Sequence, residues 1–224
     1  MTPNQVTLAR IFVAFAAVAL FSLGTHVLAL DLTAVFLTVA AIALDGVDGY
    51  IARTYGLATP FGAKFDILGD RVVENLFFTC FAASGLISLW VPVIFFARGA
   101  LTDFLRGLVR RSARSNLDQN WMLKTWWGRS LVASRTSRAS YATLKCICFC
   151  CLGCLLPIRH MPAARSAEWL SEAGTTWLLT AGQAITFATV IFCIVRAIPV
   201  VWEGRRYFAP RSKAPKAVPV VASR

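Results

Sequence analysis

The chain has 224 residues, of which 57% are hydrophobic and 15% are charged, and its formal net charge is +12. A soluble domain carries about 25% charged residues, so this composition excludes an ordinary soluble protein and indicates an integral membrane protein. A basic balance is also typical of nucleic-acid-binding proteins. Here, however, the Lys and Arg residues gather beside long apolar stretches, as they do in membrane proteins, and we expect no nucleic-acid partner.

Six membrane-spanning helices are predicted, because apolar runs of about 20 residues, the length that crosses a bilayer, recur along the chain. In chain order they cover about residues 11–30, 32–52, 65–88, 90–109, 139–158 and 175–202. The first joint is expected near Asp31. The ten residues before the first run carry one Arg, and no clear cleavage site follows, which indicates a retained span and not a signal peptide. We therefore expect one all-α membrane domain over residues 1–208.

The distribution of basic residues predicts the orientation of these spans. Segment 110–138 contains seven Lys and Arg residues and segment 203–224 contains six, whereas segment 159–174 contains two. With six spans, the segments richest in basic residues fall on one side, which the positive-inside rule assigns to the cytoplasm. Both termini are then cytoplasmic. The Pro-, Ala- and Lys-rich residues 209–224 are expected to form a disordered basic tail near anionic lipid head groups.

Five of the seven cysteines fall in the segment CICFCCLGC, residues 146–154. This stretch is apolar and predicted to be helical, so its thiols would face different sides of the helix. Cysteine in such surroundings packs as a small hydrophobic residue. We therefore predict neither a metal cluster nor a disulfide framework here.

Residues 44–70, LDGVDGYIARTYGLATPFGAKFDILGD, contain four aspartates between two apolar spans. Asp45 and Asp48 share one face of the second predicted span, and Asp66 and Asp70 share one face of the third. Because the second span ends and the third begins at the cytoplasmic side, both pairs lie at one depth. Four carboxylates there repel each other, and one or two divalent cations would relieve the repulsion. Ligands that are all oxygen suit Mg²⁺ or Mn²⁺, which often accompany phosphate groups.

These residues form the pattern D-x2-D-G-x2-A-R-x8-G-x3-D-x3-D, which resembles, without a departure, the signature of the CDP-alcohol phosphotransferases, also called CDP-alcohol phosphatidyltransferases. The matching positions are Asp45, Asp48, Gly49, Ala52, Arg53, Gly62, Asp66 and Asp70. Eight fixed positions with fixed gaps make this a specific match, and the six-span plan is also similar to the family. The opening Pro3-Asn4-x-x-Thr7-x-x-Arg10 is similar to a common family start, a short interfacial segment that helps frame the nucleotide site.

The resemblance implies a transferase that moves a phosphatidyl-type group from CDP-diacylglycerol to an alcohol and releases CMP. It assigns a pair of divalent metal ions, Mg²⁺ or Mn²⁺, to the four aspartates, and it makes Asp70 the general base on the acceptor hydroxyl. It implies a CDP-binding pocket at Gly49, Ala52, Arg53 and Gly62. A homodimer is implied as well. The orientation predicted from the basic segments places the active site at the cytoplasmic side of the membrane. The compact plan suits a bacterial cytoplasmic membrane.

Further charged residues lie inside the predicted spans, where ionisable groups almost always face the bundle interior or a wet cavity. The cations that are candidates for binding an acceptor phosphate are Arg98, Arg106, Lys145 and Arg196. Such a positive pocket suits an acceptor that already carries a phosphate, such as glycerol 3-phosphate or inositol phosphate. The alternative is internal pairing, for example of Asp103 with Arg106, and extension of Lys145 and Arg196 to the membrane interface.

Other functions remain open at the level of the sequence. Within the family, serine or another amino alcohol is the alternative acceptor. An intramembrane prenyltransferase also binds a Mg²⁺-diphosphate through aspartates, but it carries two separated Asp-rich motifs and more spans. An ion-coupled transporter with buried carboxylates predicts internal repeats and carboxylates near the midplane, and the sequence indicates neither. Of these functions, only transfer from a CDP-linked lipid requires CMP as a product.

Overall fold

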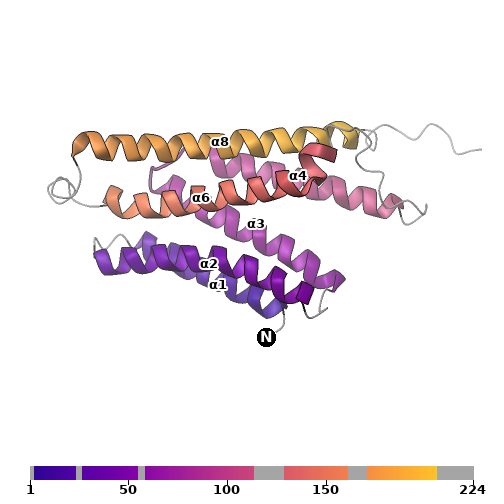
Figure 1. The fold of residues 1–224 in the computed structure, drawn as a ribbon, viewed down its shortest axis with the longest axis horizontal. Helices are drawn as coiled ribbons and strands as arrows, with labels where there is room; N and C mark the ends of the chain where they lie inside the picture. The colour runs from indigo at the N-terminus through magenta and orange to yellow at the C-terminus, as the bar shows by residue number, and fades with distance from the viewer. Residues whose placement is uncertain (1–2, 24–26, 55–58, 114–128, 161–170, 206–224) are drawn as a thin grey trace, which may run out of the picture.

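The computed structural model is helical throughout its regular elements (Figure 1). It describes residues 3–23, 27–54, 59–113, 129–160 and 171–205, and within these ranges it leaves aside the side chains of residues 3, 48–54, 106, 108–113, 129, 133, 135, 160 and 172. The helices are α1 (Pro3–Ser22), α2 (Leu28–Thr54), α3 (Pro60–Ala83), α4 (Trp90–Ala113), the short π-helix η1 (Arg129–Ala133), α6 (Arg135–His160) and α8 (Glu172–Gly204). No strand occurs in the described part of the chain.

Each of the six predicted spans corresponds to one long helix, but several ends were wrong. The predicted joint near Asp31 lies inside α2, because that helix already begins at Leu28. Asp31 is in its first turn, where the free N–H groups of a helix favour a carboxylate. The residues predicted to form a short interfacial N-terminal segment belong to α1, which runs without a break from Pro3. Proline suits the first position of a helix, where its missing N–H costs no hydrogen bond.

Four of the long helices are apolar and long enough to cross a membrane by length and composition: residues Asn4–Ser22, Leu28–Val47, Thr136–Arg159 and Ala173–Gly204. These stretches belong to α1, α2, α6 and α8. The helices α3 and α4 are of similar length, but charged residues interrupt their apolar character. The protein thus has the apolar helices of an integral membrane protein.

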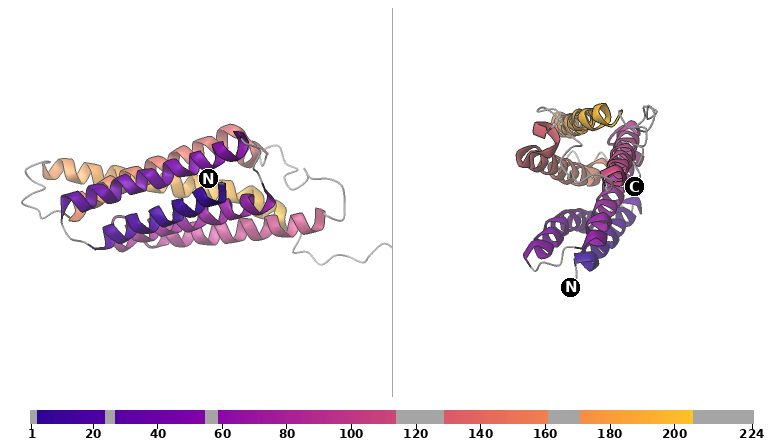
Figure 2. Two further views of the ribbon diagram at one scale, coloured as in Figure 1. Left: turned by 90° about the horizontal axis from the view of Figure 1, so that it is seen from below. Right: turned by 90° about the vertical axis from the view of Figure 1, so that its right-hand side faces the viewer.

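The long helices run roughly along one another and form two groups (Figures 1 and 2). At one side α1 packs against α2 and α3, and at the other side α8 packs against α4 and α6. Contacts of α2 with α6 and of α3 with α4 join the two groups. The helix α3 therefore lies between them, and both its charged start and its aromatic end meet neighbours from each group.

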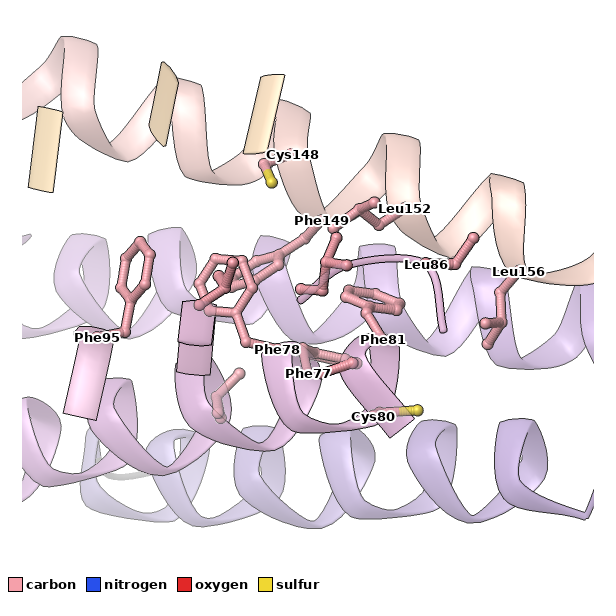
Figure 3. Close-up of a cluster of buried hydrophobic side chains, with 14 of the residues drawn as sticks. Phe77, Phe78, Cys80, Phe81, Leu86, Phe95, Cys148, Phe149, Leu152 and Leu156 are labelled. Atoms are coloured by element: carbon pink, nitrogen blue, oxygen red, sulfur yellow. The ribbon is translucent and has the colours of Figure 1, made fainter. Parts of the chain in front are cut away.

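An aromatic core holds α3 in this central position (Figure 3). Phe77, Phe78 and Phe81 on α3 and Phe95 on α4 have no exposed surface, and Phe149 on α6 is 6% exposed. The ring centroid of Phe78 lies 4.4 Å from that of Phe95 and 4.8 Å from that of Phe149. Aromatic pairs at such distances add to the gain from burial alone. This core fixes the helix that carries two of the four motif aspartates.

Candidate active site

The start of α3 is defined by its own sequence. The side chain of Thr59 accepts a hydrogen bond from the backbone N–H of Gly62 at 3.0 Å, and Pro60 follows as the first helical residue. A threonine cap satisfies one of the free N–H groups at the beginning of a helix, and proline favours the same start. Asp66 and Asp70 consequently lie within the first three turns of α3, beside the end of α2.

Three of the four motif aspartates converge at this point. One carboxylate oxygen from each of Asp45, Asp66 and Asp70 lies within 4.8 Å of the other two. Their side chains are 53%, 47% and 44% exposed, respectively, so the cluster reaches solvent. The structure thus brings together carboxylates that the helical spacing predicted to meet.

Several predicted site residues belong to helices but have side chains outside the described part of the structure. Asp48 lies one turn after Asp45 on α2, and Arg106 lies on α4. The other residues of this kind are predicted CDP-binding positions on α2: Gly49, Ala52 and Arg53. The proposed roles of these five residues remain predictions.

The guanidinium of Arg10, on α1, lies among the three carboxylates. Its Nη1 atom contacts Asp45 and lies 3.0 Å from an oxygen of Asp70, and its Nη2 atom lies 3.6 Å from an oxygen of Asp66. The Arg10 side chain is only 2% exposed. Residues 3–10, which are similar to the family's N-terminal sequence, therefore contact the aspartates directly through Arg10.

Two glycines of α3 allow α1 to approach this closely. A Cβ atom at Gly62 would lie 2.8 Å from Oδ1 of Asn4. A Cβ atom at Gly69 would lie 2.8 Å from Cγ2 of Thr7 and 2.9 Å from Nη2 of Arg10. Real Cβ contacts are longer than this, so a larger residue would force Asn4 at the first position, and Thr7 and Arg10 at the second, to shift. Gly62, a predicted CDP-binding position, thus has a packing role in this structure.

Three of the four predicted acceptor-binding cations surround one aromatic ring. The ring centroid of Tyr141 on α6 lies 5.6 Å from Cζ of Arg98, 5.2 Å from Nζ of Lys145 and 5.1 Å from Cζ of Arg196. Tyr141 is 8% exposed. Arg196 is held further by a hydrogen bond from its Nη1 atom to the backbone oxygen of Ser137 at 2.6 Å. We call Arg98, Tyr141, Lys145 and Arg196 the cation cluster.

An ion-pair network joins this cluster to α3. The buried carboxylate of Glu74, 2% exposed, lies 3.5 Å from Nζ of Lys145 and 3.1 Å from Nη1 of Arg71. Arg71 also donates from Nε to Asp103 on α4 at 3.1 Å. The alternative interpretation pairs Asp103 with Arg106 of its own helix; the Arg106 side chain lies outside the described part of the structure, so that pair stays a prediction. The described ion pair of Asp103 crosses helices and joins it to Arg71, the residue that directly follows Asp70.

Sequence reasoning missed two residues of these sites, and a local signal existed for each. Tyr141 precedes Lys145 by four residues, so the two share a helical face. Arg71 precedes Glu74 by three residues, a spacing at which opposite charges meet on a helix. Neither spacing reveals the second partner, because Arg98 and Asp103 come from another helix.

The aspartate cluster has the composition of a metal centre. Hard divalent ions such as Mg²⁺ and Mn²⁺ prefer oxygen ligands, and the oxygens around an ion at about 2.1 Å lie about 3 Å apart when adjacent and about 4.2 Å apart when opposite. The three carboxylate oxygens lie within 4.8 Å of one another, so small side-chain movements bring them to these separations. The residues present therefore fit a divalent cation.

Known proteins resemble parts of this chain. The CDP-diacylglycerol–glycerol-3-phosphate 3-phosphatidyltransferase of Rickettsia typhi is 42% identical over 71 residues, which are 32% of this chain and 39% of that protein. The enzyme of the same name from Mycoplasma genitalium is 26% identical over 136 residues, 54% of this chain and 57% of that protein.

A probable phosphatidylglycerophosphate synthase of Mycobacterium tuberculosis is 32% identical over 126 residues, 55% of this chain and 59% of that protein. Each of these matches covers less than two thirds of the relative. The model of the CDP-alcohol phosphatidyltransferase family, in contrast, matches residues 1–202 of this chain. With nearly its whole length matched and three of the four motif aspartates gathered at one point, the chain belongs to the CDP-alcohol phosphatidyltransferase family.

Proposed function

We propose that this protein transfers the phosphatidyl group of CDP-diacylglycerol to glycerol 3-phosphate and releases CMP. The observation that carries the proposal is the convergence of Asp45, Asp66 and Asp70 beside the end of α2. The names of the relatives, which are glycerol-3-phosphate phosphatidyltransferases and a phosphatidylglycerophosphate synthase, support the choice of donor and acceptor.

The metal site of this enzyme consists, in our proposal, of Asp45, Asp66 and Asp70 together with Asp48. When bound there, Mg²⁺ or Mn²⁺ would neutralise the diphosphate of the donor and the phosphate of departing CMP. Exposure of about half of each described carboxylate supports this role, because a donor has to reach the site from outside. The pattern-matching positions Gly49, Ala52, Arg53 and Gly62 would contact the CDP moiety.

Asp70 is the proposed general base. It takes the proton from the attacking hydroxyl group of glycerol 3-phosphate while the hydroxyl oxygen forms a bond to the phosphorus of the phosphatidyl group. The bond between that phosphorus and the oxygen of CMP breaks, and CMP leaves with the electron pair. The product is a phosphodiester that remains attached to the lipid.

The cation cluster would bind the phosphate of the acceptor. Arg98, Lys145 and Arg196 come from three helices and lie around one ring, so their charges concentrate in a small volume. An arginine guanidinium can hold two phosphate oxygens at once, which favours phosphate over an uncharged hydroxyl. Arg106 is the fourth proposed residue of this site. Lys145 pairs with Glu74, and Glu74 pairs with Arg71, the residue next to Asp70 in the chain. These ion pairs support an acceptor phosphate site close to Asp70.

In the membrane, the six long helices would all span the bilayer, with both termini and the aspartate cluster at the cytoplasmic side. A membrane position for α3 and α4 requires that their charged groups face the protein interior. The burial of Glu74 and the ion pair between Arg71 and Asp103 support this requirement. Residues 209–224, which lie outside the described residues, would be a basic cytoplasmic tail. A homodimer in a bacterial cytoplasmic membrane completes the proposal.

The test is CMP release by the purified protein with CDP-diacylglycerol and Mn²⁺ or Mg²⁺. Glycerol 3-phosphate, inositol phosphate, inositol and serine are offered in turn, and Asp70→Asn and Arg98→Gln are compared with Arg205→Gln. Arg205 is exposed at the end of α8, so its variant controls for loss of one positive charge. Crosslinking in native membranes tests the dimer.

We expect CMP only with glycerol 3-phosphate, loss of release in Asp70→Asn, and full release in Arg205→Gln. Release with serine and not with a phosphorylated acceptor would overturn the acceptor assignment and favour an amino alcohol. The absence of CMP with every acceptor, together with movement of ions across vesicles, would overturn the enzyme and favour an ion-coupled transporter.

A further inference from the structure

Arg10 differs from the carboxylates around it in how it meets solvent. Its side chain is 2% exposed, whereas the side chains of Asp45, Asp66 and Asp70 are about half exposed. The guanidinium therefore contacts the carboxylates from the protein interior and leaves their outer sides open.

We propose that Arg10 is a built-in counter-ion that positions the aspartate cluster. It holds Asp45, Asp66 and Asp70 close to the separations that a divalent cation requires, so the site does not depend on the ion for its assembly. Arg10 is a positioning residue in this inference and has no direct contact with substrate. The inference rests on the proposed metal site for its meaning, but its contacts exist independently of any ion.

The charges explain why the cluster needs such a residue. Three carboxylates whose oxygens lie within 4.8 Å repel one another, and partial burial strengthens the repulsion because the local dielectric is lower than that of water. One guanidinium can bind several carboxylates at once, since it carries five N–H groups in a fixed plane. Arg10 uses Nη1 for two of the aspartates and directs Nη2 towards the third. A lysine would offer the charge without this geometry.

The packing of α1 against α3 places the Arg10 guanidinium next to the aspartates. Gly69 lies between Asp66 and Asp70 in the chain, and its missing side chain leaves the space that Thr7 and Arg10 occupy. A single Cβ atom there would lie 2.9 Å from Nη2 of Arg10. The same glycine thus brings the guanidinium to both neighbouring carboxylates. This close approach is a second observation, independent of the ion pairs, that connects Arg10 to the cluster.

The experiment is a double-mutant cycle of Arg10→Met and Asp45→Asn in the full-length protein in detergent, read by thermal unfolding in EDTA. Arg10→Met should lower the unfolding temperature by about 5 to 10 °C, because it removes the ion pairs of a buried guanidinium with three carboxylates. Asp45→Asn should raise this temperature in the Arg10→Met background, where it removes repulsion. In the protein with Arg10 it should lower the temperature or leave it unchanged, because it removes a partner of Arg10.

The same four proteins are then measured with Mn²⁺ in place of EDTA. We expect Mn²⁺ to raise the unfolding temperature more in Arg10→Met than in the protein with Arg10, because the ion then supplies the missing positive charge. Arg10→Lys should lie between the two. These measurements need no lipid donor or acceptor, so they separate this inference from the proposed reaction.

Two results would overturn the inference. One is an equal shift of the unfolding temperature by Asp45→Asn in both backgrounds, which would mean that Arg10 and Asp45 act independently. The other is a folded Arg10→Met protein that loses no stability in EDTA. If Arg10→Met fails to fold, recovery of a folded protein in the double variant supports the inference, and failure of both variants overturns it. Absence of any Mn²⁺ effect in a cycle that still shows coupling would overturn the metal site alone.

Discussion

The ring of Tyr141 on α6 lies 5.1 Å from the guanidinium carbon of Arg196 on α8, and it is shared with Arg98 and Lys145. The face of an aromatic ring carries partial negative charge, which attracts cations. Three cations from three helices would otherwise repel one another. The ring therefore reduces the repulsion among the three cations. In the proposed function, the negative charge of the acceptor phosphate neutralises them further.

Replacing this ring should weaken acceptor binding specifically. Tyr141→Leu removes three cation–π contacts, each worth about 0.5–1 kcal/mol or more, and we expect the KM for glycerol 3-phosphate to rise about tenfold or more. The KM for CDP-diacylglycerol should stay unchanged. Tyr141→Phe keeps the ring and should behave as the unmodified protein does. An equal loss in Tyr141→Phe would show that the hydroxyl group, and not the ring, matters.

Asp45 and Asp70 should respond differently to added metal. Asp45→Asn removes one proposed ligand, so activity should fall and recover in part at higher Mn²⁺ concentration. Asp70→Asn removes the proposed general base as well, and kcat should fall by about 10²- to 10⁴-fold without such recovery. Initial rates of CMP release over a Mn²⁺ titration measure both. Recovery of Asp70→Asn to the level of Asp45→Asn would assign Asp70 to metal binding alone.

The aspartate cluster could be predicted from the sequence because its information is local. Asp45, Asp66 and Asp70 lie on α2 and α3, which follow each other closely in the chain, and helical spacing places each aspartate on a predictable face. Arg10 lies 35 residues before Asp45 in the chain. No spacing rule states which face of α1 meets α3, so its contact with three carboxylates required the structure.

The pairing of Asp103 shows the same limit. Helical spacing predicts only a partner on the same helix, such as Arg106 three residues away. The structure adds an ion pair between Asp103 and Arg71 of α3, which spacing does not predict. Gly99 leaves the Arg71 side chain room to cross, since a Cβ atom at Gly99 would lie 3.2 Å from its Cδ and Nε atoms. Helix existence could likewise be predicted from apolar runs. Helix ends, such as the start of α2 before Asp31, depend on caps and packing that those runs do not contain.

Gly69 and Gly46 form a matched pair for testing the approach of α1 to α3. Alanine favours a helix over glycine by about 1 kcal/mol, so Gly46→Ala, where an added Cβ meets nothing within 4 Å, should stabilise the protein slightly. At Gly69 the same gain is offset by overpacking against Thr7 and Arg10, which costs about 1–3 kcal/mol. We expect Gly69→Ala to be the less stable variant by about 2 kcal/mol in denaturant titrations. Equal stability of the two would mean that α1 shifts freely.

Glu74 should be the carboxylate whose loss costs most stability outside the motif. It is 2% exposed and faces both Arg71 and Lys145. Removing one member of a buried ion pair leaves an uncompensated charge, and such changes cost about 3–5 kcal/mol. We expect Glu74→Gln to lower the free energy of unfolding by about 3 kcal/mol. Denaturant titration of the purified protein measures this loss.

Asp103→Asn is the matched control, because it also removes a carboxylate partner of Arg71 but at a side chain that is 32% exposed. Solvent screens such a site, so the loss there should be about 1 kcal/mol or less. Adding Lys145→Met to Glu74→Gln should restore part of the stability, since the unpaired ammonium group is removed with its partner. If the double variant is less stable than Glu74→Gln, the Lys145 charge is compensated by other groups, and the buried pair is not what joins α3 to α6.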